Sequence, residues 1–254
     1  MPGPPPSPAV RGAAPAGAAD EASASAAVRR MFTAIAPRYD LLNHLLSLNV
    51  DKLWWCRAAR TFSAVLRRPG ARVLDLCCGT GDMTLSLLRR SARAAAGQQF
   101  FGLDFSHAML VRALAKSTAA PIRWVEADAL HLPFADRSFD LITSAFGFRN
   151  LANYDAGLRE IARVLAPGGQ LGILDFGEPD GLIGRLYRFY FRQVLPRIGS
   201  AVSGVRGPYA YLPASVHRFP PPAEMLARME KAGLREVSWT PYTFGIAGLY
   251  RGIR

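Results

Sequence analysis

The chain has 254 residues, half of them hydrophobic and a fifth charged, which is the composition of a globular protein and excludes a disordered or fibrous one. Lys and Arg outnumber Asp and Glu by 31 to 19, and the formal charge of +12 fits either simple solubility or an anionic partner, a nucleic acid or a membrane surface. The three cysteines show no CxxC spacing, which excludes a disulfide scaffold and a zinc ribbon and favours a reducing compartment.

The start of the chain differs in composition from the rest. Residues 1–27 consist almost wholly of Ala, Pro, Gly and Ser, so we predict a disordered tail. They have neither the apolar region of a secretory signal nor the arginine-rich, acid-free composition of a transit peptide, so we expect a cytoplasmic protein. No apolar run reaches the roughly 18 residues of a membrane span. From Val28 onward apolar positions recur at helical spacing, which predicts capping helices over 28–68.

Short apolar runs then alternate with helical patterns. We predict strands over 72–76, 99–103, 122–125, 139–144 and 170–175, and helices over 82–91, 106–116 and 154–165. This alternation predicts an α/β fold with a mostly parallel, doubly wound sheet that helices cover on both faces. Such sheets bind ligands at the carboxyl ends of their strands, so we expect the site in the loops that follow the first four strands.

A glycine-containing loop follows the first predicted strand and reads Asp75-Leu76-Cys77-Cys78-Gly79-Thr80-Gly81-Asp82. Gly79 and Gly81 let the backbone turn tightly and approach a ligand closely. The loop is not a dinucleotide fingerprint, because Thr84 stands where the third glycine would be, and it lacks the Gly-Lys-Ser/Thr of a P-loop. We assign the two cysteines to packing.

Acidic residues also follow the next two predicted strands. Asp104 comes about 20 residues after the glycine loop, where a carboxylate accepts hydrogen bonds from both hydroxyls of a ribose. The alternative is that Asp104 only caps the following helix. Asp128 and Ala129 follow the third strand, and Asp128 taken alone would be an ordinary loop carboxylate. Three acids after three successive strands favour a cofactor pocket.

The pattern D-x-x-x-G-x-G at Asp75–Gly81 resembles motif I of class I S-adenosylmethionine-dependent methyltransferases. Two longer stretches, Tyr39–Ser47 with Leu53-Trp54, and Phe146–Asn150 with Arg163–Gly169, are similar to signatures of the ubiquinone/menaquinone biosynthesis C-methyltransferase family. The resemblance covers residues 28–254 and implies one Rossmann-like methyltransferase domain. His44 and Asp51 depart from it, because the family usually has an acid and a histidine there.

The resemblance implies S-adenosylmethionine as the methyl donor and a prenylated quinol as the acceptor. It places Thr80, Asp104, Asp128 and Ala129 at cofactor-binding positions, with the acid at 128 facing the adenine amino group. We also assign Asp75, Gly79 and Gly81 of the glycine loop to cofactor binding. Ala145 stands at a further cofactor position where the family usually has Ser. A hydroxyl contact is therefore missing there, or Ser144 supplies it.

Methylation of a quinol ring carbon is helped by a base, or by a cation that stabilises the phenolate. Arg149 is the first candidate, acting directly or through a water; the alternative is a surface salt-bridge arginine. Asn150 would bond the quinol or position Arg149. Tyr39 would contact the cofactor or quinol, or only pack in the core. We predict no metal, because His107 and His131 lack metal-like spacing with acids or cysteines.

Residues 181–223 contain no acid and are rich in arginines and aromatic residues. Arg185, Arg188 and Arg192 share one helical face, which favours contact with an anionic membrane surface at the inner face of the cell membrane. The alternative is a solvated basic face over core aromatics. RNA is the rival partner, and the quinone-family signatures, not the charge, decide against nucleic acid.

We therefore expect conversion of 2-demethylmenaquinol to menaquinol. The alternatives are a benzoquinol of the ubiquinone pathway, another methyl acceptor such as RNA, or a non-catalytic protein that keeps the fold. The sequence leaves the oligomeric state open and is compatible with a homodimer.

Overall fold

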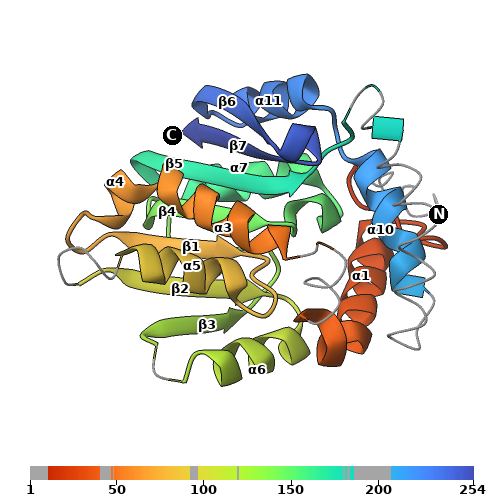
Figure 1. Cartoon of the computed structure of the whole chain (residues 1–254), viewed down its shortest axis with the longest axis horizontal. Coiled ribbons are helices and arrows are strands. Elements are labelled where there is room, and N and C mark those ends of the chain that lie inside the picture. Colours follow the sequence, from red (N-terminus) through yellow and green to blue (C-terminus); the bar gives the residue numbers. More distant parts are fainter. Residues whose placement is uncertain are drawn as a thin grey trace, which may run out of the picture.

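A computed structural model describes residues 11–40, 47, 49–91, 97–118, 120–179, 181, 184–185 and 207–254 (Figure 1). A seven-stranded sheet forms its centre, in the order β3-β2-β1-β4-β5-β7-β6. Neighbouring strands from β3 to β5 are parallel, whereas β7 is antiparallel to both β5 and β6. The strands are β1 (Arg72–Leu76), β2 (Gln99–Asp104), β3 (Ile122–Glu126), β4 (Phe139–Ala145), β5 (Leu165–Phe176), β6 (Arg235–Tyr242) and β7 (Ala247–Ile253).

Helices cover both faces of this sheet, as predicted. One face carries α3 (Val50–Thr61), α4 (Ser63–Leu66) and α5 (Asp82–Ser91), and the other carries α7 (Tyr154–Val164) and α11 (Pro222–Lys231). The edge beside β2 and β3 carries α6 (His107–Lys116). Beyond the carboxyl ends of the parallel strands lie α1 (Glu21–Ile35), η1 (Ala36–Arg38) and α10 (Gly207–Arg218) (Figure 1). Short turns η2 (Phe148–Asn150) and η4 (Thr243–Gly245) follow β4 and β6.

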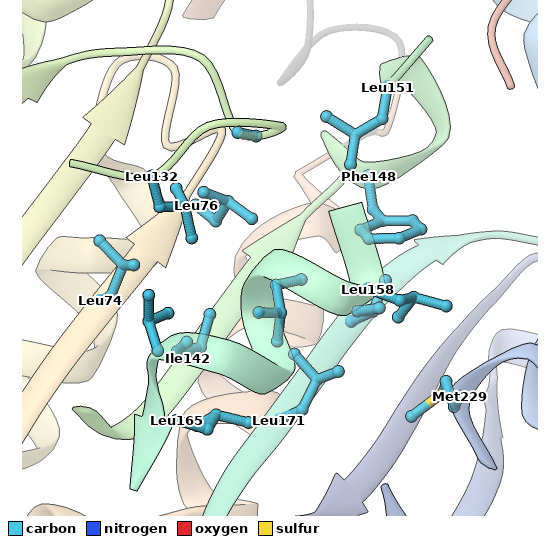
Figure 2. Packing of buried hydrophobic residues seen from close by; sticks show 14 of the residues in the cluster. Leu74, Leu76, Leu132, Ile142, Phe148, Leu151, Leu158, Leu165, Leu171 and Met229 are labelled. Atoms are coloured by element: carbon cyan, nitrogen blue, oxygen red, sulfur yellow. The ribbon is translucent and has the colours of Figure 1, made fainter. Parts of the chain in front are cut away.

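The central strands are apolar on both faces, because each strand residue contacts the helix layer on its own side. Leu74 of β1 packs toward α7, whereas its neighbour Val73 packs toward α3 and α5. Figure 2 shows Ile142 of β4 and Leu158 of α7 within the first of these clusters, and both are fully buried. This rigid platform holds the loops at the strand ends.

The strand order reverses between β1 and β4. β1 pairs with β2 on one side and with β4 on the other, so the loops that leave β1 and β4 diverge to opposite faces. A crevice forms at such a switch point, outside the carboxyl ends of the strands. The fold therefore places the glycine loop after β1 opposite the segment Phe146–Asn150 after β4.

The N-terminal segment corrects one prediction. Within the expected disordered tail 1–27, α1 already begins at Glu21, and Asp20 and Ser23 form a capping box at its start. Ala13 is 2% exposed, and a Cβ on Gly12 would lie 2.1 Å from the carbonyl oxygen of Leu151. The small residues serve close packing here, so the tail prediction is wrong from residue 11; residues 1–10 lie outside the described residues.

The sequence patterns predicted no strand or helix in the C-terminal part of the chain after residue 223. β6, β7 and α11 form a hairpin and a helix that the sequence patterns did not resolve. In the basic segment 181–223, Arg185 is exposed, whereas Arg188 and Arg192 lie outside the described residues. None of the helices that the structure describes is long and apolar enough to cross a membrane.

Candidate active site

A cavity of about 940 Å³, including its open mouth, lies at the carboxyl ends of β1, β2, β3 and β4 and beneath α1 and η1. Its wall includes all of the predicted cofactor-binding residues except Gly81, namely Asp75, Gly79, Thr80, Asp104, Asp128, Ala129 and Ala145. Tyr39 and Asn150 of the predicted catalytic residues also line it, whereas Arg149 does not. Four loops and the helical cap thus converge on one cavity that opens to solvent.

The two positions in the loop require glycine for different structural reasons. Gly79 has φ +54°, lines the cavity, and faces the ring of Tyr39, which would lie 3.8 Å from an added Cβ. Gly81 has φ +87°, but its added Cβ would lie 2.6 Å from the indole of Trp124. Gly79 therefore leaves room at the cavity, whereas Gly81 leaves room for a tryptophan of the sheet, a reason that the spacing of the motif does not reveal.

Asp104 is fixed at the cavity wall by main-chain donors. Its Oδ2 accepts from the Gly79 N–H at 2.9 Å, and its Oδ1 accepts from the Ser106 N–H at 2.9 Å. Burial raises the pKa of Asp104 to about 6, although these amide bonds oppose the rise. Each carboxylate oxygen keeps a further lone pair, so Asp104 can accept hydrogen bonds from a bound hydroxyl pair.

Asp75 touches the cavity, but its hydrogen bonds hold the fold together. Its two oxygens accept from the hydroxyls of Thr84, at 2.6 Å, and Thr143, at 2.9 Å. These bonds join β1 to α5 and to β4 at the start of the glycine loop. Burial is the largest cause that raises the pKa of Asp75, to about 7, with the two hydroxyls opposing it.

Thr80 belongs to a polar cluster that joins the cap to the glycine loop. Its hydroxyl donates to Asp40 Oδ1 at 2.5 Å and accepts from Lys116 Nζ at 2.9 Å. Lys116 also pairs with Asp40, at 2.8 Å, and with Asp82, at 3.0 Å. We call Asp40, Thr80, Asp82 and Lys116 the cap latch. Sequence reasoning missed Lys116, because no motif marks the end of α6.

The third and fourth strands supply a more apolar part of the wall. Asp128 Oδ1 accepts from the Leu130 N–H at 2.9 Å, which shapes the loop, and Ala129 is 4% exposed. Ala145 lines the cavity, but Ser144 is fully buried outside the lining, and its hydroxyl has no partner among the described residues. The apolar wall is completed by Phe146 of the second family-like stretch and by residues that no motif singled out, among them Phe32, Trp55, Phe105, Met109 and Leu151.

Arg149 lies behind the wall, 5% exposed. Its Nη1 pairs with Asp175 Oδ1 at 2.9 Å and also donates to the Phe146 carbonyl, and its own N–H donates to Asp175 Oδ2 at 3.0 Å. The guanidinium stacks on the Phe176 ring, 5.1 Å from its centre. The alternative that the sequence left was a surface salt-bridge arginine, whereas this bridge is buried. Its partner, Asp175 at the end of β5, was missed by sequence reasoning.

Asn150 and Tyr39 come from segments far apart in the sequence and both line the cavity. Asn150 Oδ1 accepts from the hydroxyl of Tyr211 at 3.1 Å. The ring of Tyr39 packs edge-on against Phe32, with 6.1 Å between centroids. Both side chains line the cavity, so the structure brings together a hydroxyl and an amide with the acidic cofactor positions.

The same residues offer no metal centre. Among the described residues, no group of three or more His, Cys, Asp or Glu side chains could hold a metal ion. His107 instead contacts Glu126 at 2.9 Å. The cysteines beside the glycines are packed, and burial raises the pKa of both thiols well above the usual range.

Comparison with known proteins identifies the family of this chain. The model of the ubiE/COQ5 methyltransferase family matches residues 20–254. Demethylmenaquinone methyltransferase of Deinococcus radiodurans is 47% identical, over 92% of this chain and 95% of that protein. Demethylmenaquinone methyltransferase of Thermus thermophilus is also 47% identical, over 88% of this chain and all of that protein. Ubiquinone/menaquinone biosynthesis C-methyltransferase UbiE of Geobacter sulfurreducens is 42% identical, over 89% and 87%.

Solved structures agree on the fold. An S-adenosylmethionine-dependent methyltransferase of Thermotoga maritima, described as a possible histamine N-methyltransferase, matches 88% of this chain and 98% of that chain with a TM-score of 0.62 and 18% identity. A Haemonchus contortus phosphoethanolamine N-methyltransferase in complex with S-adenosylhomocysteine matches 77% and 52%, with a TM-score of 0.55 and 16% identity. These likenesses confirm the predicted Rossmann-like methyltransferase fold.

Proposed function

The chain belongs to the ubiE/COQ5 methyltransferase family, and from this premise we propose that it methylates a ring carbon of a prenylated quinol, 2-demethylmenaquinol, to give menaquinol. Two relatives at 47% identity carry the name demethylmenaquinone methyltransferase. Another, at 42%, is named for both ubiquinone and menaquinone synthesis, so a benzoquinol is the second candidate acceptor. The single observation that carries the proposal is the cavity in which the acidic cofactor positions meet Asn150 and an apolar wall.

The residues present fit S-adenosylmethionine. Asp104 offers acceptor lone pairs at the cavity wall, and Gly79 leaves the space beside it open. We propose that Asp104 holds the ribose hydroxyls and that Asp128 and Ala129 hold the adenine. When bound, this donor supplies an electrophilic methyl group: its sulfur keeps the electron pair of the broken bond, the quinol carbon gains the methyl, and the ring proton leaves to solvent.

The chain's own residues align the reactants and stabilise developing charge. We propose that Asn150 and Tyr39 contact the quinol, since both line the cavity. Asn150 donates to the quinol oxygen as it becomes anionic. We propose that Arg149 acts from behind the wall: its pair with Asp175 and its bond to the Phe146 carbonyl hold η2 against β5. Arg149 is then a positioning residue, not the cation that meets the phenolate.

We also propose that the protein works at a membrane surface, because a prenylated quinol is a lipid. Leu53 is 68% exposed and Phe244 is 76% exposed, and their neighbours Trp54 and Thr243 are hydrogen-bonded at 2.8 Å. The segments that carry these two exposed apolar side chains are thus joined at the carboxyl end of the sheet. A groove between α3 and α5 is lined by Lys52, Arg60, Arg89 and Arg90, together with one acid, Asp82, and this excess of positive charge suits an anionic lipid surface.

The proposed function is tested by following labelled methyl from S-adenosylmethionine into chemically reduced demethylmenaquinol and into a benzoquinol precursor. We expect transfer to the naphthoquinol, loss of transfer in Asp104→Ala, and a lower rate in Arg149→Ala. Asp136→Ala, at an exposed acid outside the cavity, is the control. Transfer to neither quinol by a protein that binds the donor would refute the proposal, and transfer to the benzoquinol alone would replace the acceptor.

A further inference from the structure

We propose that Tyr211 is a positioning residue that orients the amide of Asn150, so that Nδ2 faces the cavity and donates a hydrogen bond to the oxygen anion of the acceptor. The inference rests on the proposed function, because it assigns the substrate contact of the same site. Tyr211 lies on α10, within the basic segment 181–223 but outside both family-like stretches, and it reaches Asn150 from behind the cavity wall.

The argument begins with what an asparagine offers. Its amide has an oxygen that accepts and a nitrogen that donates, and rotation by half a turn exchanges the two. Asn150 is 9% exposed and lines the cavity, so one of these groups faces the bound acceptor. The hydroxyl of Tyr211 donates to Oδ1 at 3.1 Å, which leaves Nδ2 for the cavity. An Oδ1 in that place would repel a phenolate, whereas Nδ2 stabilises it.

The surroundings of Tyr211 keep its hydroxyl a donor. Burial is the largest influence on this group and raises the pKa of Tyr211 to about 12, so the hydroxyl stays protonated at working pH. Arg149 and Arg218 are near enough to favour negative charge on the Tyr211 oxygen, and Asp175 opposes them. Positive neighbours attract the oxygen end of the hydroxyl dipole, which leaves the hydrogen for Oδ1 of Asn150.

The main chain fixes the rest of η2, so the Tyr211 bond governs the side chain alone. The Asn150 N–H donates to the Gly147 carbonyl at 3.0 Å, and Tyr154 donates to the Arg149 carbonyl at 3.0 Å. Asp175 holds the Arg149 N–H and guanidinium on the other side. Tyr211→Phe removes one hydroxyl and leaves these contacts in place, so it tests the amide orientation and not the folding of the turn.

The test uses 1-naphthol, whose anion absorbs at longer wavelength than its neutral form, as a probe of charge stabilisation in the cavity. Its pKa when bound is measured by absorbance for the wild type, Tyr211→Phe, Asn150→Ala, the double variant and Tyr250→Phe. A donor aimed at the naphthol oxygen lowers this pKa. We expect Tyr211→Phe to raise the bound pKa by about half a unit or more, Asn150→Ala at least as much, and the double variant no more than Asn150→Ala alone.

Tyr250→Phe is the matched control, because Tyr250 is a buried tyrosine of β7 near Asp175 with no place in the cavity wall. We expect it to bind naphthol with the wild-type pKa. An unchanged pKa in Tyr211→Phe, additive effects in the double variant, or no naphthol binding by the wild type would each overturn the inference. In methyl transfer, Tyr211→Phe should lower kcat about tenfold and move the acidic limb of the pH profile to higher pH, with the donor's Kd unchanged.

The experiments distinguish a failure of the proposed function from a failure of the inference about Tyr211. If the naphthol pKa behaves as expected and the wild type methylates no quinol, the proposed function fails while the orientation of Asn150 stands. If the wild type methylates demethylmenaquinol and Tyr211→Phe matches it in kcat, pH profile and naphthol pKa, only the inference fails.

Discussion

Buried carboxylates of the same strand-end region have different partners, and the partners decide their roles. Asp104 is bonded by main-chain amides that leave lone pairs at the cavity, whereas Asp75 is bonded by two threonine hydroxyls of the protein itself. The sequence motif predicted both as cofactor residues, because spacing reports which residues are near a site and not which atoms they bond. Thr84, which the motif marked only as a missing glycine, is one of the partners.

The role of Asp104 gives a prediction on donor affinity. Asp104→Ala should weaken S-adenosylmethionine binding about tenfold or more, because hydrogen bonds to a charged group contribute about 1.5–3 kcal/mol. Calorimetric titration measures this, with Asp136→Ala as the control. For the wild type, affinity should fall as the pH drops through about 6, where Asp104 becomes protonated and loses acceptor capacity. An affinity that Asp104→Ala leaves intact would exclude Asp104 from the donor site.

The raised pKa of Asp75 predicts that the stability of the folded protein depends on pH. Burial raises its pKa in the folded protein to about 7, from 3.8. The folded state therefore binds this proton more tightly than the unfolded state, so the contribution of Asp75 to stability is lost as the pH rises from about 4 through 7. Asp75→Asn removes that loss, and its Tm relative to the wild type should rise across this range. A Tm difference that is independent of pH between 4 and 8 would contradict the assignment.

At the scale of elements, the alternating pattern predicted β1 to β4 to within one residue, because buried parallel strands are continuous apolar runs. It placed the start of β5 at residue 170, whereas that strand begins at Leu165. It also missed the first half of α1, whose alanines were assigned to a disordered tail although Ala24 is fully buried. The helix predicted over 154–165 ends one residue earlier in the structure, because β5 begins at Leu165. Composition cannot distinguish small residues that pack closely from small residues that do not pack.

The cap latch joins separate elements of the fold, and it leads to a prediction about the rate at which S-adenosylmethionine is released. Lys116 joins Asp40 of the cap to Thr80 and Asp82 of the glycine loop. Lys116→Met should loosen the cap and speed S-adenosylmethionine release by about two- to tenfold, since partly exposed ion pairs contribute about 0.2–1 kcal/mol each. High salt should reproduce the effect in the wild type. Stopped-flow release measures it, with Lys231→Met on α11 as the control; equal rates would show that the latch does not hold the cap.

At the scale of the whole molecule, the sequence placed membrane contact on Arg185, Arg188 and Arg192, and the described residues add Leu53 and Phe244, which no linear pattern connects. The turn after β6 folds back to α3, where Thr243 accepts a hydrogen bond from Trp54, and this joins the two segments. We predict that Leu53→Ser with Phe244→Ser lowers binding to phosphatidylglycerol vesicles about tenfold, from the loss of apolar burial. Leu114→Ser, at another exposed apolar position, is the control; equal vesicle binding by all three proteins would contradict the proposed surface.

The position of the transferred methyl tests the central claim most directly. The wild type is supplied with S-adenosylmethionine that carries a ¹³C methyl and with reduced demethylmenaquinol, and the extracted product is examined by ¹³C NMR. The account predicts a single enriched signal from a methyl bonded to the ring carbon of a naphthoquinone. An enriched methyl ether, or no enriched product from a protein that binds the donor, would contradict it.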